Sequence, residues 1–294
     1  MSRGWRRAAR LGAGIVGGIV GLAVLLLLVA NVVSLVRQHR RYDIPDTALT
    51  VPADSASISR GRHLVIAVTA CTSCHGADLG GQVVMDEPLL GRFVGSNLTA
   101  GAGGLGRQNI DRDLVRAIRH GVGRSDRSLV FMPSESFQEL SDRDLGAIVA
   151  YLRTVPPVDR SLTPTRVGPM GRALHLVGFP LLPAEVIDHQ RRVAEPPARA
   201  GVDYGSYLAT LAGCRGCPGP ELRGGGGPGP SLTSGALAGW TEADFGRAVR
   251  EGRRPDGSAL AEPMPWRNYA GMTDDEMSAL WQYVRSRLQV SAPK

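Results

Sequence analysis

Five consecutive residues, Cys71-Thr72-Ser73-Cys74-His75, carry the clearest chemical signal in the sequence. Two cysteines spaced by two residues and followed directly by histidine form an attachment site for a c-type haem. The thiols would bond covalently to the porphyrin, and the adjacent imidazole would then bind the iron. A bare CxxC also occurs in zinc sites and in thioredoxin-like redox pairs. Zinc needs two more ligands at suitable spacing, and the thioredoxin motif lies in a βαβ pattern that is absent here.

The basic excess of the chain comes from its N-terminus. The 294 residues have a formal net charge of +7, but residues 1–41 alone contain seven arginines and no acidic residue. Removing these seven leaves 27 basic and 27 acidic residues for positions 42–294. A segment without net charge lacks the basic bias that favours nucleic acids. We therefore expect no nucleic-acid partner.

Residues 11–36 form an uncharged, largely apolar run within the N-terminal segment 1–41. As a helix this run would extend about 39 Å, enough to cross roughly 30 Å of hydrocarbon with some tilt. A cleaved signal peptide would have a shorter apolar core and a small-residue cleavage site, so an uncleaved single-pass anchor is the better interpretation. Covalent haem attachment is completed outside the cytoplasm. We therefore expect residues 42–294 on the periplasmic, or equivalent exterior, side of the inner membrane.

A linker at 42–58 precedes a first domain at 59–155, in which the apolar periodicity is helical. The loop between its later helices contains Phe131-Met132-Pro133. Start and stop signals predict three helices: one over 60–70 with Ser59 as N-cap, one over 111–120 ended by Gly121, and one opened by Ser141 and stopped by Pro156-Pro157.

Residues 59–155 resemble a class I c-type cytochrome domain, with a helix leading into CxxCH and a methionine loop 57 residues past the histidine. The resemblance implies His75 and Met132 as axial iron ligands and the two cysteines of the motif, Cys71 and Cys74, as covalent anchors. A thioether ligand favours ferrous iron and raises the reduction potential. The alternative role of Met132 is that of a core methionine. Met85 is a weaker candidate ligand, and His63 and His120 are interpreted as surface or haem-edge side chains.

A connector at 156–200 holds eight prolines, a density that excludes long regular structure. Within it, residues 173–187 are fairly apolar and could form a short helix broken at Pro180. This segment is interpreted as a strap packed between domains. A contact with a membrane surface or with a partner protein is the alternative.

The sequence then repeats itself over residues 201–294. Cys214 and Cys217 lie 143 positions after the first cysteine pair, and the later helices recur at offsets of 131 and 132. Met264 corresponds to Met132. Such ordered matches predict two tandem copies of one fold. The predicted fold class is therefore all-α, with an N-terminal transmembrane helix followed by two cytochrome c-like domains. A capping-box pattern at Thr273 and Glu276 corresponds to Ser141 and Asp144.

The second motif, Cys214-Arg215-Gly216-Cys217-Pro218, lacks the histidine. Proline has no ligand atom, and residues 190–294 contain no histidine. We therefore expect one covalent haem c in the chain and none in the second domain, where Cys214 and Cys217 stay reduced or pair with each other. The region 224–227 is expected to collapse into the space that a haem would fill.

Across 59–288 the chain resembles membrane-anchored two-domain c-type cytochromes. The resemblance implies an electron carrier, not itself an enzyme, that links a periplasmic dehydrogenase or oxidase to the respiratory chain. One rival is a haem enzyme that oxidises a small sulfur compound or acts as a peroxidase. The other rival is a non-redox scaffold or assembly protein whose second domain is an interaction module.

Overall fold

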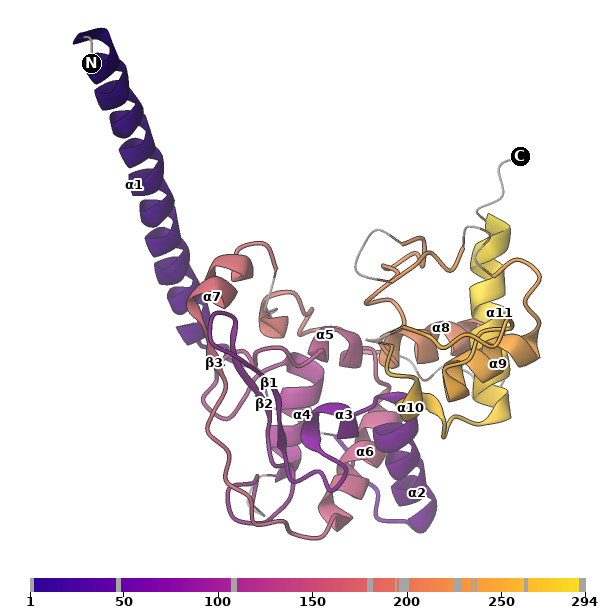
Figure 1. Ribbon diagram of the computed structural model, residues 1–294. Helices are drawn as coiled ribbons and strands as arrows, with labels where there is room; N and C mark the ends of the chain where they lie inside the picture. The colour runs from indigo at the N-terminus through magenta and orange to yellow at the C-terminus, as the bar shows by residue number, and fades with distance from the viewer. Residues whose placement is uncertain are drawn as a thin grey trace.

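A long N-terminal helix, α1 (Arg3–His39), projects from a helical body in the computed structural model (Figure 1). The body consists of a first lobe, residues 55–155, and a second lobe, residues 202–290, which lie side by side. The structure describes residues 3–45, 49–106, 110–178, 182–193, 195, 201–224, 229–233, 235, 237–261 and 264–290. Pro180 and residues 225–227, for which the sequence made predictions, lie outside these ranges.

The first lobe is built around the crossing of its first and last helices. Gly61 makes this crossing close, because a Cβ atom at this position would lie 1.8 Å from the backbone oxygen of Ala147. The helices of the lobe are α2 (Ser55–His63), the π-helical segment η1 (Leu64–Val68), α3 (Thr72–His75), α4 (Ile110–His120), α5 (Ser134–Phe137) and α6 (Asp142–Thr154).

The first helix begins earlier than the sequence predicted. Asp54, and not Ser59, caps it, with its carboxylate accepting a hydrogen bond from the Ser57 N–H at 2.9 Å. Both residue types are good caps, and the extended conformation of Asp54, which precedes the first turn, decides between them. The later boundaries are confirmed: Gly121 ends α4 at φ +62°, and Ser141 caps α6.

The prediction of an all-α fold is wrong, because the chain carries a small antiparallel sheet in the order β1-β2-β3. Its strands are β1 (Gln82–Glu87), β2 (Gly91–Gly95) and β3 (Arg166–Val167). β-Branched and aromatic residues, among them Val83, Phe93 and Val94, favour the hairpin β1-β2. Gly91 admits β3, since a Cβ there would lie 2.3 Å from the Arg166 oxygen. The rest of the described chain is mostly helical.

The second lobe repeats the packing of the first. A Cβ atom at Gly205 would lie 2.0 Å from the Ala279 oxygen, as Gly61 meets the Ala147 oxygen in the first lobe. Arg119 donates to the Leu140 oxygen at 2.9 Å, and Arg250 donates to the Met272 oxygen at 2.6 Å. The helices of this lobe are α8 (Val202–Leu211), α9 (Glu242–Glu251), α10 (Trp266–Tyr269) and α11 (Asp274–Val290).

The capping box predicted at the start of α11 is present. Thr273 N–H donates to Glu276 Oε2 at 3.0 Å, and Glu276 N–H donates to Thr273 Oγ1 at 3.2 Å. At the corresponding start of α6, Asp144 N–H donates to Ser141 Oγ at 3.1 Å. Both acidic side chains are buried.

These two acids join the lobes. Arg60 of α2 binds Asp144 with two hydrogen bonds of 3.1 Å and donates to Glu276 at 3.2 Å. His63 lies 2.7 Å from Glu276 Oε2 across the same junction, and the Tyr207 hydroxyl donates to Asp144 at 2.9 Å. Each lobe therefore contributes a side chain to the acid of the other lobe, and we call these five residues the joint.

The helix expected over 173–187 does not form as one element. The described residues of the connector instead contain two short helices, α7 (Pro169–His175) and η2 (Pro183–Glu185). Both helices hold the end of α1. Ser34 Oγ lies 2.8 Å from His175 Nδ1, and Arg37 forms an ion pair with Glu185. The connector therefore fixes α1 to the body, in addition to leading from the first lobe to the second.

Candidate haem-binding site

Cys74 and His75 lie on the single turn α3 and Cys71 is its N-cap, three residues after the end of η1. Cys71 N–H donates to the Val65 oxygen at 3.0 Å, which joins the turn to the preceding helix. Residues three apart on a turn present their side chains on one face, so the two sulfurs can reach one planar group. All four cysteines of the chain are free thiols in this structure, and burial raises the pKa of Cys71 to about 11.

The imidazole of His75 is fixed by one hydrogen bond, from Nδ1 to the Ser96 backbone oxygen at 2.7 Å. A carbonyl oxygen can only accept, so Nδ1 carries the proton and the lone pair lies on Nε2. Burial lowers the pKa of His75, which favours the neutral ring. A neutral imidazole whose other nitrogen donates to a backbone carbonyl is the usual arrangement of a metal-ligating histidine. The donor set therefore fits a haem iron.

Strand β2 lies between the haem motif and the methionine loop. At its end, a Cβ atom on Gly95 would lie 1.8 Å from the Cys74 oxygen, so only glycine allows this approach. Earlier on the strand, the buried ring of Phe93 contacts Phe131, with the ring centroids 5.3 Å apart. Phe131 directly precedes Met132. The sequence-predicted ligands thus belong to two segments that pack on one strand.

The loop that carries Met132 has a constrained backbone. Phe131 adopts φ +72°, a left-handed conformation that is rare for a bulky residue and is held only when the surroundings enforce it. Ser134 anchors the far side of the loop, because its hydroxyl donates to the Ala117 oxygen of α4 at 2.8 Å. Met132 itself is partly buried against the hydrophobic core, whereas Met85 lies on β1.

The second motif occupies the corresponding turn of the second lobe. Cys214 N–H donates to the Ala209 oxygen at 2.9 Å, as Cys71 does to Val65. A Cβ on Gly229 would lie 2.7 Å from Cys217 Cβ, much as Gly95 meets Cys74. Pro218 follows Cys217 and offers no nitrogen ligand. Met264 is partly buried against the core, like Met132.

Several residues near the site escaped the sequence reasoning. Ser96 acts through its backbone oxygen, which any residue type supplies, so the sequence holds no signal for it. Asn268 of α10 donates to Ser73 Oγ at 2.5 Å, across 195 positions of the chain, and therefore brings the second lobe onto the haem motif. The surface interpretation of His120 is wrong: this residue is 2 % exposed and lies 3.2 Å from His189. His63 belongs to the joint.

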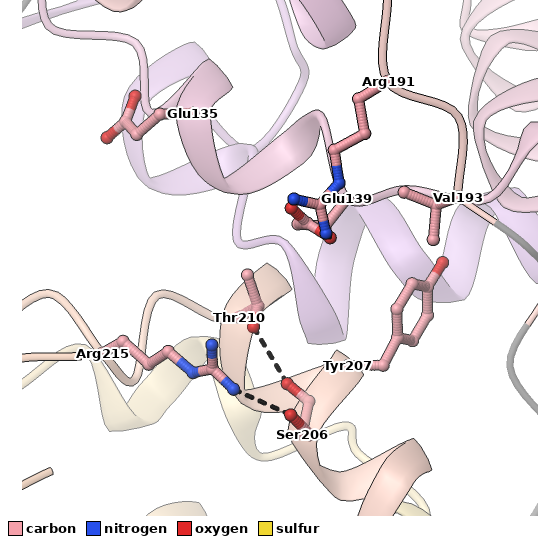
Figure 2. A pocket seen from close by; sticks show the side chains of 8 residues that line it. All are labelled: Glu135, Glu139, Arg191, Val193, Ser206, Tyr207, Thr210 and Arg215. Carbon is pink, nitrogen blue, oxygen red and sulfur yellow. Dashed lines mark hydrogen bonds and ion pairs between the residues drawn. The ribbon is translucent and has the colours of Figure 1, made fainter. Parts of the chain in front are cut away.

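Two polar clefts flank the contact between the lobes, and none of the predicted haem ligands lines either of them. One, of about 540 Å³, lies between α5 and α8, where Arg191 pairs with Glu139 and Arg215 donates to Ser206 at 2.7 Å (Figure 2). The other, of about 490 Å³, is lined by joint residues. Neither cleft therefore belongs to the candidate haem site, which is formed by the segments around α3 and β2.

Comparison with known proteins agrees with this site. Residues 56–152 match the family described as cytochrome c oxidase, cbb3-type, subunit III. This chain contains a c-type cytochrome domain. The match covers the whole cysteine and histidine motif and Met132. The match of this domain implies a covalently bound haem c, and over residues 56–152 it confirms the resemblance to a c-type cytochrome domain.

The proteins to which this chain is similar include cytochrome subunits of dehydrogenases. It is 32 % identical to a fructose dehydrogenase cytochrome subunit of Gluconobacter japonicus over 39 % of this chain and 25 % of that protein. It is 26 % identical to a gluconate 2-dehydrogenase cytochrome c subunit of Pantoea cypripedii over 80 % of this chain and 60 % of that protein. A dihaem cytochrome of Cereibacter sphaeroides is 27 % identical over 77 % of this chain and 84 % of its own length. The chain thus spans only part of the two dehydrogenase subunits.

Proposed function

We propose that this chain is a membrane-anchored c-type cytochrome that carries electrons between a dehydrogenase and the respiratory chain. The observation that carries the proposal is the orientation of His75, whose Nδ1–H donates to the Ser96 oxygen and leaves Nε2 for the iron. Haem supplies one-electron chemistry, in which iron cycles between ferric and ferrous states. The polypeptide sets the potential, the access and the docking surface.

Each residue of the site has a distinct role in this proposal. Cys71 and Cys74 would hold the porphyrin covalently, and the imidazole of His75 and the sulfur of Met132 would bind its iron. The strained Phe131 and the buried Phe93 hold the methionine loop in place. A loop restrained in this way keeps a soft thioether at the iron, which favours the ferrous state.

We further propose that the second lobe is a cytochrome c-like domain without covalent haem. The repeated helix crossing and the matching cysteine turn support the common fold. Pro218 at the histidine position supports the loss of the haem, although one relative is a dihaem cytochrome. The second lobe then serves as a structural partner of the first.

The anchor is the helix α1, whose segment Arg10–His39 is long and apolar enough to cross a membrane. Covalent haem attachment is completed outside the cytoplasm, so the proposal places both lobes on the periplasmic or equivalent exterior side. The names of the dehydrogenase relatives support a dehydrogenase on a separate chain as the electron donor. The same reasoning assigns no catalytic step to this chain.

Haem stoichiometry and ligand substitution test the proposal together. A pyridine haemochrome assay with intact mass on the purified full chain is expected to give one covalent haem. Met132→Ala should lower the reduction potential and remove the sulfur-to-iron charge-transfer absorption of the ferric protein. Met264→Ala is the matched control, since both methionines pack against the same core, and its spectrum should equal that of the parent.

Two covalent haems per chain would overturn the reading of the second lobe. A chain without haem would overturn the electron-carrier function. An unaltered spectrum of Met132→Ala would show that Met132 does not ligate the iron, and would favour a haem enzyme whose iron is open or bound by another group.

A further inference from the structure

An apolar patch lies beside the point where α1 leaves the body. It consists of Leu89 at the tip of the β1-β2 hairpin, Met170 on α7, and Leu176 and Val177 directly after α7. These side chains are 65 %, 45 %, 45 % and 81 % exposed, respectively. Met170 N–H donates to the Leu89 oxygen at 3.0 Å, which joins the hairpin tip to α7. We call these four residues the α7 patch.

The position at which α7 packs on α1 indicates how deep the α7 patch lies relative to the bilayer. About 20 helical residues cross roughly 30 Å of hydrocarbon, so a span that starts at Leu11 is complete near Ala30. Ala30 is 5 % exposed and Ser34 is fully buried, whereas Val29 is 50 % exposed. Ala30 and Ser34 lie four residues apart, on one face of the helix. The body therefore meets α1 in the last part of the apolar run 11–36, at the end of the helix where the hydrocarbon boundary is expected.

Hydrogen bonds hold α7 at this height. Ser34 bonds the ring of His175, and Arg37 donates to the backbone oxygen of the same residue at 3.3 Å. Arg37 also binds the carboxylate of Glu185, with its Nε 3.1 Å from both oxygens. In Figure 1, α7 lies against the end of α1, on the side of the body from which α1 projects. The turn that holds Leu176 and Val177 is thus carried close to the bilayer.

We propose that the α7 patch inserts into the boundary between headgroups and acyl chains of an anionic phospholipid bilayer. Insertion of apolar side chains at this depth is favourable, because their apolar surface area leaves water and enters the acyl region. Two basic residues that directly follow α1, Arg40 and Arg41, are exposed and fit anionic headgroups, although Arg41 also lies 3.9 Å from Asp126. The inference rests on the membrane anchor of the proposed function. Its consequence is a first lobe with a fixed orientation to the membrane, because a second contact prevents free rotation about α1.

Lipid photo-crosslinking on the full, haem-loaded chain tests this inference. The protein is reconstituted into phosphatidylcholine vesicles that contain phosphatidylglycerol and a phospholipid with a diazirine near the top of its acyl chain. Lipid adducts are then mapped by mass spectrometry. Adducts are expected on α1 and on residues 169–178. The matched control is the start of α8, where Val202 is 43 % exposed, close to the value for Met170, but lies in the second lobe.

Adducts on residues 169–178 should exceed those on α8 several-fold, and Val177→Asp should reduce them to the α8 level without changing the adducts on α1. Vesicles of phosphatidylcholine alone should give fewer adducts on the patch. Adducts on α1 with none on residues 169–178 would overturn the patch and leave the anchor intact. A chain without adducts on α1 would overturn the anchor and the inference with it. Equal labelling in neutral vesicles would refute the preference for anionic lipid.

Discussion

The close helix crossings make a sharp prediction about three glycines. Gly61→Ala and Gly205→Ala should each destabilise the protein, because the new methyl group would lie 1.8 Å and 2.0 Å from backbone oxygens of the facing helices. Neither oxygen can rotate away, so the helices must separate. Gly246→Ala is the control: it lies in helix α9, and its new Cβ would meet Met277 Cγ at an ordinary 3.5 Å.

The expected magnitudes follow from two opposing effects. Alanine is favoured over glycine in a helix interior by about 1 kcal/mol. Overpacking typically costs about 1–3 kcal/mol and occasionally more, and contacts this short belong at the upper end. The net loss at Gly61 or Gly205 is therefore about 2 kcal/mol, which corresponds to roughly 8–16 °C in Tm for a lobe of this size. Gly246→Ala should be neutral or stabilising by up to about 1 kcal/mol.

Thermal unfolding of the full chain, followed by far-ultraviolet circular dichroism and by haem absorbance, measures these effects. Gly61→Ala should lower the transition seen by haem absorbance, since Gly61 lies in the haem-bearing lobe. Gly205→Ala should lower the transition of the second lobe. If Gly61→Ala and Gly205→Ala were as stable as Gly246→Ala, the helix crossings would be looser than the structure shows. The close crossing would then no longer support a fold shared by the two lobes.

Two further predictions concern the second motif and the joint. Pro218→His restores CxxCH in the second lobe and should raise the haem content above one per chain in cells that contain the attachment machinery; unchanged content would mean that the lobe has no room for haem. Glu276→Gln removes a buried charge of the joint and should cost about 2 kcal/mol. Burial raises the pKa of Glu276, but hydrogen bonds from His63 and Thr273 and the charge of Arg60 lower it by more, so this pKa lies below the ordinary value for a glutamate. A carboxylate whose pKa is lowered by folding stabilises the protein at pH values above its unfolded-state pKa. This stabilisation is lost as the pH falls through the folded-state pKa. The parent should therefore lose stability in acid more steeply than Glu276→Gln, and parallel pH curves would contradict this role.

The sequence predicted those helices whose signals are local. The helix ended by Gly121 and the capping box of Thr273 and Glu276 depend on residues within a few positions of one another, and the structure contains both. The sheet was missed because β1 and β2 gain their stability from pairing across a turn, and β3 joins them from 71 or more positions away. The choice between Asp54 and Ser59 as the cap depended on backbone conformation, which composition does not reveal.

The haem motif could be read from the sequence because covalent attachment requires particular residue types at fixed spacing. The contacts that hold this motif in place could not be read from the sequence. The Ser96 oxygen belongs to the backbone, and the contact of Asn268 with Ser73 joins residues 195 positions apart. The joint could not be predicted for the same reason, because Arg60 and Glu276 are 216 positions apart in the sequence. Only the folded chain brings such residues together.

The joint would hold the second lobe in place whether or not that lobe binds a haem, as the proposed function requires. The helix crossings make Gly61 equivalent to Gly205, which also aligns His63 with Tyr207. Asp144 and Glu276 are likewise equivalent, as the third residues of their helices.

His63 bonds Glu276 of the second lobe, and Tyr207 bonds Asp144 of the first, so equivalent residues exchange equivalent contacts. This reciprocity is the pattern that an isologous interface would show if the two lobes are copies of one fold, as we propose. Its residues lie on the paired first and last helices, away from the turn that holds Pro218. In the proposed function, Pro218 at the histidine position would therefore deny the second lobe an iron ligand without affecting the contact that holds the two lobes together.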